Sequence, residues 1–580
     1  MQGFSDMLDR YAHAAGEKAA ASAGETGNRF RELSRICHSL TLYPPSTFHE
    51  ALQSFWFLHL CLQIDSNGHS MSPGRFDQYT WRCYENDMRR GVSPEREEEL
   101  LGCLWVKFAE ISKLRDYMGS LAFGGYPMFQ NLIVGGMDAD GNDVTNDVSV
   151  LCCKVTAELK LSQPSLSVRW HKHSARRMKL AAAEVARAGI GMPAYFNDEA
   201  IIPVLRNIGC SLAEARDYCE VGCVEPHVAG RMEGMYSAGF TNLCKVLETT
   251  IFNGVDPIRG KQIGLAVGEQ FEDFTAFYDA YRTQQRYFMD LHAQSVNAVE
   301  FAHNTLCPTP LVSCFVDDCI ERGVDIRRGG AHYNYTSPNA VGLANLGDSM
   351  LVIKRKIFEE KKYSMDELRG FLRSDFVGHE RVRQEFLNDV PKYGNDDDEA
   401  DAMARRCGED YCIDFKRYTG YRGASFQPGL QSISAHALFV GSLGATPDGR
   451  TKQMLVSDGG VSPAQGRDIC GPTAAMLSVA KLNHLEATNG ALLNVKFHPS
   501  AVKGERGLEN LCALTDAFFG LGAQHVQYNV VDSEILRDAQ KHPEKYGDLV
   551  VRVAGFSVLF TTLDTVLQND IIERTQHNCC

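Results

Sequence analysis

Short apolar runs bounded by glycine alternate with longer helical patterns along most of this chain, and no other feature constrains its fold as strongly. The apolar runs span residues 131–134, 166–168, 492–495 and 526–531. The helical patterns include residues 177–188, 273–299 and 350–360. Such alternation is typical of an α/β architecture, and over this length it favours one barrel-like core with many insertions.

The N-terminal residues predict helices. Residues 1–40 are rich in alanine, glutamate and arginine, with one small break near 24–28. Ser46–Glu50 has the pattern of an N-cap, which predicts a further helix running to Leu62. Far along the chain, the acidic run 394–401 predicts a solvated loop.

The composition is that of a globular protein with a sizeable core, since 44% of the 580 residues are hydrophobic and 23% are charged. At roughly 150 residues per domain, this length suggests about four domains. The net charge is −14 and the pI is ≈ 5.7. Nucleic acids and anionic membranes attract net-basic surfaces, so neither class of partner is expected.

The 19 cysteines form neither a disulfide framework nor a cluster-binding motif. No CxxC pair occurs, and scattered cysteines, including the adjacent Cys152 and Cys153, predict small apolar core positions. The N-terminus has early acidic residues and lacks the apolar segment of a secretory signal. A reducing, cytoplasmic setting is therefore expected.

Motifs for nucleotide binding and for hydrolysis are missing, since the chain has no phosphate loop, HExxH, GxSxG or strand-linked GxGxxG. His171 and His173 could suggest a metal, but nothing nearby supplies the other ligands. We expect them to be a surface pair, and we expect no metal site.

The segment 217–227 brings a thiol and a carboxyl close together. Gly222 and Pro226 disfavour a helix, because proline biases the residue before it toward extended geometry. In an extended segment side chains alternate, so Cys223 and Glu225 point to the same side. Such a pair can serve as a reactive sulfur with an acid–base partner. A buried cysteine beside a surface glutamate explains the segment equally well when it is taken alone.

A second segment, 551–560, places Gly555 in an otherwise apolar stretch flanked by aromatic residues. Glycine weakens such a stretch unless backbone geometry or chemistry needs it. A bulge or a tight turn beside a strand accounts for Gly555 equally well when this segment is taken alone.

Taken together, the two segments closely resemble the glycyl radical enzymes. The first contributes Gly-Cys-Val-Glu-Pro at 222–226, and the second contributes Arg-Val-Ala-Gly-Phe at 552–556. Other matching segments are 67–78, 125–131, 329–334, 444–450, 458–463, 525–529 and 567–575. The resemblance therefore extends from about residue 47 to the end of the chain.

The resemblance implies a ten-stranded α/β barrel, made of two antiparallel five-stranded half-barrels and surrounded by helices. Residues 1–450 are expected to form the pyruvate formate-lyase-like barrel domain, and residues 451–580 the C-terminal glycyl radical domain. One barrel thus replaces the four domains that the length suggests. The family's N-terminal helical region is expected to be lacking, which predicts a fragment or a reduced member, and a homodimer is implied.

By the same resemblance, Gly555 is the modified residue that stores a radical, and Cys223 passes the radical to the substrate as a thiyl. Glycine suits this role because an α-carbon without a side chain can flatten and share its unpaired electron with both flanking amides. No cofactor is expected to bind tightly. A separate S-adenosylmethionine-dependent iron–sulfur activating enzyme is the implied partner, and a bacterial microcompartment is the alternative to the open cytoplasm.

Two residues reduce the set of reactions that the resemblance implies. Pyruvate formate-lyases carry a second cysteine where this chain has Gly222, so their chemistry is disfavoured. Glu225 resembles the carboxylate with which dehydratases and choline trimethylamine-lyase take the proton of a substrate hydroxyl. The expected function is radical elimination on a small hydroxylated substrate, most like a glycerol or 1,2-diol dehydratase. The alternatives are a C–N or C–S lyase of the same family and a truncated, inactive scaffold chain.

Four further residues are implied to bind the substrate. His69 and Ser70 match the dehydratases' Gly-His-Ser, which holds substrate hydroxyls, and Tyr126 occupies a matching pocket position. Ser237 departs from the pattern, because diol dehydratases have His-Asp where this chain has Tyr236 and Ser237. A hydroxyl cannot replace a carboxylate as a strong acceptor, so glycerol itself is in doubt.

Overall fold

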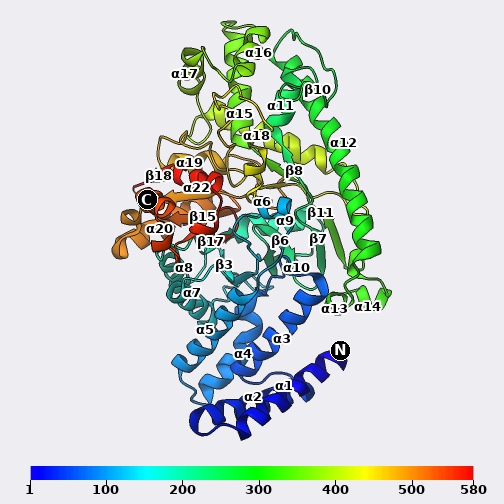
Figure 1. Ribbon diagram of the computed structural model, residues 1–580, viewed down its shortest axis with the longest axis vertical. Helices are drawn as coiled ribbons and strands as arrows, with labels where there is room; N and C mark the ends of the chain where they lie inside the picture. The colour runs from blue at the N-terminus through cyan, green and yellow to red at the C-terminus, as the bar shows by residue number, and fades with distance from the viewer. Residues whose placement is uncertain (1, 579–580) are drawn as a thin grey trace.

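The computed structural model describes residues 2–578 and centres on one mixed sheet (Figure 1). Its strands, in spatial order, are β1 (Gly74–Arg75), β2 (Asn131–Gly135), β3 (Ser165–Trp170), β4 (Ala194–Asn197), β15 (His525–Val530), β14 (Asn494–Phe497) and β18 (Gln576–His577). Neighbouring strands are parallel except where β4 meets β15. The sheet therefore consists of two parallel halves that run antiparallel to each other.

The predicted apolar runs all overlap strands of this sheet, although β14 begins at Asn494 rather than Leu492. β2, β3 and β15 are buried along their whole length, as expected for strands of a sheet that helices cover. The covering helices pack against one another and against these strands; they are α7 (Asp147–Leu159), α8 (Arg176–Arg187) and α20 (Gly504–Gly520). Cys152 and Cys153 lie buried on α7, as predicted.

Helices form the N-terminal end of the molecule, at the bottom of Figure 1. They are α1 (Gln2–Ala20), α2 (Gly24–Leu42), α3 (Phe48–Ser66), α4 (Phe76–Arg89) and α5 (Pro94–Glu110). One break interrupts the N-terminal helical stretch, as predicted, but it lies at residues 21–23, and the predicted position 24–28 forms the start of α2. The predicted N-cap is confirmed too, because Thr47 and Glu50 form a reciprocal capping box at the start of α3.

A second group of helices lies at the opposite end of the molecule (Figure 1). It includes α11 (Leu243–Ile251), the long α12 (Phe274–Leu306), α15 (Leu343–Val352), which continues as a π-helix (Ile353–Glu359), α16 (Met365–Arg373), α17 (Glu380–Asn388) and α18 (Asp398–Phe415). The acidic run is a loop only in its first half, since α18 begins at Asp398 with Asp397 as its N-cap. Acidic side chains favour this helix start because the N-terminus carries partial positive charge.

Smaller sheets surround the central one. β8 (Phe240–Asn242), β12 (Asn339–Val341) and β13 (Gly429–Leu430) are parallel, as are β7 (Met232–Met235) and β11 (Tyr333–Thr336), whereas β9 (Val255–Asp256) and β10 (Lys261–Gln262) are antiparallel. The predicted α/β architecture is confirmed. The hydrogen-bonded sheets among residues 2–578 do not include a closed ten-stranded barrel.

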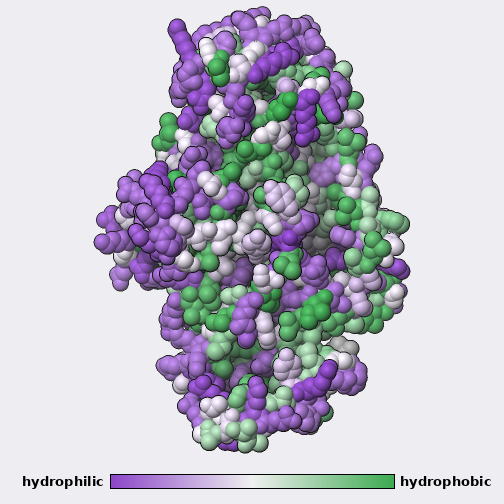
Figure 2. Space-filling view, viewed as in Figure 1, coloured by the Kyte–Doolittle hydropathy of each residue, from purple (hydrophilic) through white to green (hydrophobic). Residues whose placement is uncertain are grey.

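The remaining helices are short connectors. They are α6 (Tyr117–Ala122), α9 (Asp198–Asn207), α10 (Leu212–Arg216), α13 (Pro310–Ser313), α14 (Cys319–Arg322), α19 (Pro472–Ala480), α21 (Ser533–Lys541) and α22 (Thr565–Glu573). No helix within residues 2–578 combines the length and apolar character needed to cross a membrane. On the face shown in Figure 2, polar side chains dominate, and apolar ones gather near α13 and α14, where Phe315 and Ile320 are exposed.

Two apolar clusters make up most of the core. The larger one fills the space between the sheet and the helices at both ends. The second contains Cys223 and Val224 together with Val553, Ala554 and Phe556. The segments that the sequence singled out therefore share one apolar core although they lie far apart in the chain.

Candidate active site

The cysteine segment is a β-hairpin made of β5 (Tyr218–Val221) and β6 (Glu225–Val228). Val221 pairs with Glu225, so the tip consists of Gly222, Cys223 and Val224. Gly222 has a φ of 68°, a left-handed conformation that glycine adopts without strain. The predicted non-helical geometry is confirmed, and we refer to this element as the cysteine hairpin.

The glycine segment is a second hairpin, made of β16 (Val550–Arg552) and β17 (Ser557–Leu559). Its tip, residues 553–556, is buried and closes with a hydrogen bond of 3.0 Å from the Val553 N–H to the Phe556 carbonyl. Gly555 has a φ of 79°. We refer to this element as the glycine hairpin.

The tips of the two hairpins touch. A Cβ built on Gly555 would lie 2.5 Å from Cys223 Sγ and closer still to Cys223 Cβ, which no real side chain tolerates. Gly555 is therefore required both by its backbone conformation and by the approach of Cys223. The two residues that the sequence paired by resemblance are direct neighbours in space.

Side chains from other elements hold the backbone of the glycine hairpin. Asn494 of β14 donates to the Val553 carbonyl at 3.1 Å, and Asn529 of β15 donates to the Arg552 carbonyl at the same distance. Arg574, at the end of α22, also donates to the Val553 carbonyl, at 2.7 Å. The tip is thus fixed through its peptide groups.

The Cys223 thiol is only 1% exposed and stays protonated. Burial raises its pKa well above the ordinary value, and the nearby Glu225 carboxyl raises it further, against the opposing effect of Arg552. A protonated thiol can give up a hydrogen atom, whereas a thiolate has none to give. The environment therefore suits hydrogen-atom transfer between Cys223 and its neighbour Gly555.

The Glu225 carboxyl is buried beside the thiol. Its Oε2 accepts hydrogen bonds from the Cys223 N–H at 2.6 Å and the Val224 N–H at 2.8 Å, and its Oε1 accepts one from Gln431 Nε2 at 3.1 Å. Burial raises the pKa of Glu225 to about 7, against these hydrogen bonds, which lower it. A carboxyl with a pKa in this range can both accept and return a proton near neutral pH.

A cavity of about 620 Å³ opens beside the cysteine hairpin, and its wall includes His69, Ser70, Glu225 and Ser237. Ser70 and Glu225 come close together, because a Cβ on Gly222 would lie 3.3 Å from Ser70 Oγ and 3.1 Å from Glu225 Oε2. Four residues predicted as site residues from distant parts of the chain thus share one cavity.

His69 lies on the cavity wall as a neutral ring. Its Nδ1 accepts a hydrogen bond of 3.1 Å from Arg115 Nη1, and its ring packs edge-on against Phe123. Enclosure by protein lowers the pKa of His69 to about 3, and the positive charges of Arg115 and Lys113 add to this effect. The residue as a whole is nonetheless exposed.

Tyr126 is not brought into this site. Its side chain is 54% exposed and lies outside the wall of the cavity. Its backbone has a left-handed φ of 57°. Tyr236, the chain neighbour of Ser237, also lines the cavity, and its hydroxyl is 2.6 Å from His227 Nδ1.

The expected surface pair of histidines is wrong for His171, which is 1% exposed and lies 3.2 Å from Asp143 Oδ1. The contact with this carboxylate explains the buried histidine by its structural role, without a metal ion. Within residues 2–578, no group of three or more His, Cys, Asp or Glu side chains is arranged to hold a metal ion.

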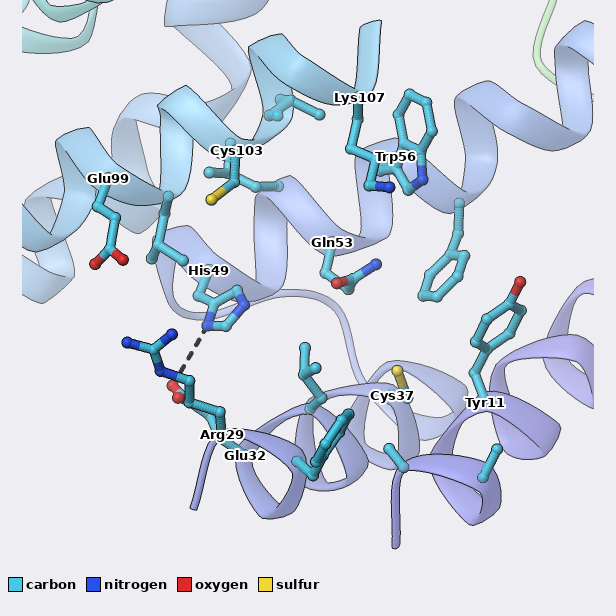
Figure 3. Close-up of a pocket in the computed structure, with 18 of the residues that line it drawn as sticks. Tyr11, Arg29, Glu32, Cys37, His49, Gln53, Trp56, Glu99, Cys103 and Lys107 are labelled. Atoms are coloured by element: carbon cyan, nitrogen blue, oxygen red, sulfur yellow. Dashed lines mark hydrogen bonds and ion pairs between the residues drawn. The ribbon is translucent and has the colours of Figure 1, made fainter. Parts of the chain in front are cut away.

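A second large cavity, of about 670 Å³, lies among the N-terminal helices α1, α2, α3 and α5 (Figure 3). Its labelled lining residues include Tyr11, Trp56 and Cys103, and His49 Nδ1 lies 3.3 Å from Glu32 Oε1. None of its lining residues comes from either hairpin. The cavity beside Glu225 is therefore the candidate active site.

Sequence reasoning missed several residues of this site. Gln431 holds Glu225, Asn494 and Asn529 hold the glycine hairpin, and Lys113 and Arg115 line the cavity. The one available signal was an amide inside a predicted buried strand, as for Asn529 within 526–531. Such an amide needs a buried hydrogen-bond partner.

Comparisons with known proteins agree with this geometry. The family model described as Pyruvate formate lyase-like matches residues 1–440, and the one described as Glycine radical matches residues 457–561. The glycerol-bound structure of the B12-independent glycerol dehydratase from Clostridium butyricum is 44% identical with a TM-score of 0.96, covering 99% of this chain and 73% of that one.

Two curated relatives are named for substrates other than glycerol. Trans-4-hydroxy-L-proline dehydratase from Clostridioides difficile is 37% identical, covering 98% of this chain and 72% of the relative. (2S)-3-sulfopropanediol dehydratase from Klebsiella oxytoca is 38% identical, covering 98% of this chain and 70% of the relative. The chain belongs to the pyruvate formate-lyase-like glycyl radical enzymes, and it is a lyase.

Proposed function

We propose that this chain removes water from a small hydroxylated substrate by radical chemistry, with Gly555, Cys223 and Glu225 as catalytic residues. The observation that carries the proposal is the contact between the two hairpin tips, at which Gly555 meets the Cys223 thiol beside the Glu225 carboxyl. A separate S-adenosylmethionine-dependent activating enzyme removes a hydrogen atom from the Gly555 α-carbon to start the reaction.

The steps balance with these three residues. The Gly555 radical takes the hydrogen atom of the Cys223 thiol, and the resulting thiyl takes a hydrogen atom from the substrate carbon that carries a hydroxyl. Glu225 accepts the proton of that hydroxyl, which drives the C–O bond on the adjacent carbon to break. The departing hydroxide receives this proton and leaves as water, and the product radical takes a hydrogen atom from Cys223. The resulting thiyl takes a hydrogen atom from the Gly555 α-carbon, which restores the stored radical.

The cavity supports the same assignment. Ser70 approaches the Glu225 carboxyl, so a hydroxyl hydrogen-bonded to Ser70 lies within reach of the base. Burial of the hairpin tips keeps water away from the radical. His69 and Ser237 line the same space and are proposed to contact the substrate. The chains are proposed to pair as homodimers.

The test is anaerobic activation followed by a substrate panel. With an activating enzyme and S-adenosylmethionine, the wild type should give a glycyl doublet in electron paramagnetic resonance and convert at least one hydroxylated substrate to a carbonyl product. Cys223→Ser is the matched control, expected to keep the doublet and lose turnover. A stable radical with no turnover across diols, hydroxy acids, choline and sulfonates would overturn the proposal.

Brief exposure of the activated protein to air is a second readout. Oxygen should cleave the chain at the radical-bearing Gly555 and release the residues that follow it. An unbroken chain after full activation would contradict radical storage at this position.

A further inference from the structure

Two cations on the wall of the active-site cavity have no anionic partner among the residues that the structure describes. Lys113 and Arg115 lie in the loop between α5 and α6, are half-buried, and form no ion pair with any residue in 2–578. Lys113 Nζ donates to the Asn67 carbonyl, and Arg115 donates to the Pro127 carbonyl and to His69 Nδ1. Arg115 Nε is buried and has no hydrogen-bond partner within the described part of the chain.

The other charged groups of the cavity wall do not neutralise this pair. Arg327 is already paired with Glu233 at 2.6 Å, so their charges cancel. Glu225 is held by two backbone N–H groups and Gln431, away from a basic side chain. The cavity therefore keeps a positive charge, although the chain as a whole has a net charge of −14.

The histidines of the wall add no negative charge and little positive charge. Burial lowers the pKa of His227 to about 4 and lowers that of His303 as well. His69 is also neutral near pH 7, because its pKa is about 3. Burial lowers the pKa values of Lys113 and Arg115 too, which reflects the unfavourable environment of cations without a counter-charge.

These cations lie close to the proposed hydroxyl site. Arg115 contacts His69, whose chain neighbour Ser70 approaches Glu225. Ser70, Glu225 and both cations line the same cavity, so one molecule bound there can face the cations with one end and Glu225 with the other.

We propose that the substrate is a small hydroxylated acid, whose carboxylate or sulfonate binds Lys113 and Arg115 while its hydroxyl-bearing carbons face Ser70 and Glu225. An anion supplies the counter-charge that the cavity lacks, and a guanidinium matches two oxygens of such a group. Ser237 is consistent with this substrate, because a carboxylate at that position would repel it. The inference rests on the proposed function, whose site it shares.

The test measures binding to the unactivated protein by calorimetry, with ligand pairs that differ only in the anion. One pair is 1,2-propanediol and 2,3-dihydroxypropane-1-sulfonate, and the other is glycerol and glycerate. At low salt, at least one acid should bind about 10-fold or more tightly than its neutral partner. This preference should shrink as salt rises, because salt screens charges in an open cavity. Equal or tighter binding of both neutral partners would overturn the inference.

Substitutions of Lys113 and Arg115 test whether these two side chains cause the preference for acids. Lys113→Gln and Arg115→Gln should each weaken binding of the preferred acid by about 10-fold or more, and Arg115→Lys should restore part of that loss. Lys261→Gln, at an exposed position on β10, is the matched control and should bind like the wild type. Acid binding by both cavity variants at wild-type strength would contradict the assignment. If a variant fails to fold, the salt dependence of acid binding by the wild type tests the inference instead.

Binding and turnover separate the two proposals. Calorimetry on the unactivated protein needs no radical, so acid binding can hold even if Gly555 stores none. Conversely, turnover of neutral diols without any preference for acids would retain the proposed radical chemistry and remove the inference about the substrate.

Discussion

The cysteine hairpin and the glycine hairpin are alike in backbone and different in surroundings. Both are antiparallel, both have a glycine with positive φ at a buried tip, and the tips touch at Cys223 and Gly555. The cysteine hairpin, however, borders a cavity through Glu225, whereas the glycine tip is enclosed and held by side chains from β14, β15 and the end of α22.

This difference matches two chemical tasks. Handling a substrate needs a side chain with access to a cavity, and the cysteine hairpin places the Glu225 carboxyl on the cavity wall next to the buried Cys223. Storing a radical needs exclusion of water and a fixed backbone, which the glycine hairpin obtains from its burial and from Asn494, Asn529 and Arg574. If the two tasks separate in this way, substitutions in the two hairpins should have different effects on radical storage and on substrate turnover.

The largest effect is expected from Gly555→Ala. The added Cβ would collide with Cys223, and the left-handed φ would be strained, so radical formation and turnover should both be lost. Electron paramagnetic resonance after anaerobic activation, together with a product assay, measures both. Cys223→Ser should lose turnover but keep the radical. A glycyl doublet in Gly555→Ala would contradict radical storage at Gly555.

Glu225→Gln should affect substrate chemistry and leave storage intact. The glycyl doublet should remain, while kcat falls about 10²–10⁴-fold because the proton acceptor is gone. In the wild type the carboxyl must be ionised to accept a proton and its pKa is about 7, so kcat/KM should fall as the pH drops below 7. The variant should lack this dependence, and an unchanged pH profile would remove Glu225 from the role of base.

Asn529→Ala should loosen the glycine hairpin without touching the substrate cavity. It removes the hydrogen bonds of Asn529 to the Arg552 carbonyl and N–H and leaves that carbonyl only the 3.3 Å bond from Arg574, which should lower the free energy of unfolding by about 1–3 kcal/mol. Chemical denaturation measures this loss, and spin counting should show a lower radical yield at wild-type substrate affinity. Asn388→Ala, on the outer helix α17, is the control. Weaker substrate binding with a normal radical yield would reverse the assignment.

The smallest effect is expected from Tyr126→Phe. The side chain is 54% exposed and outside the cavity wall, so KM and kcat should stay within about 2-fold of the wild type. Steady-state kinetics on the preferred substrate tests this. A large rise in KM would return Tyr126 to the substrate site that the family resemblance implies.

Local sequence signals predicted local structure well where one interaction dominates. The Thr47–Glu50 capping box fixed the start of α3, and Gly222 with Pro226 indicated a non-helical turn. The acidic run near Asp398 was interpreted as a loop because its charges suggest solvent, whereas a helix N-terminus also favours them.

The site itself could be predicted only in part. Cys223, Glu225 and Gly555 stand out because glycine and proline frame them, but their meeting was implied by resemblance and not by any local pattern. Lys113, Arg115 and Gln431 could not be identified, because their roles depend on contacts with residues far away in the chain, such as His69 and Glu225. Charged and amide side chains are common on surfaces, so their type alone indicates no site.

The central claim is that a hydrogen atom passes between the Gly555 α-carbon and the Cys223 sulfur. The direct test is electron paramagnetic resonance of the activated protein in D₂O, since a thiol hydrogen exchanges with solvent and would carry deuterium to the α-carbon. The wild-type doublet should collapse toward a single line, and the Cys223→Ser doublet should persist. A doublet that persists in the wild type, or collapses equally in Cys223→Ser, would contradict the account.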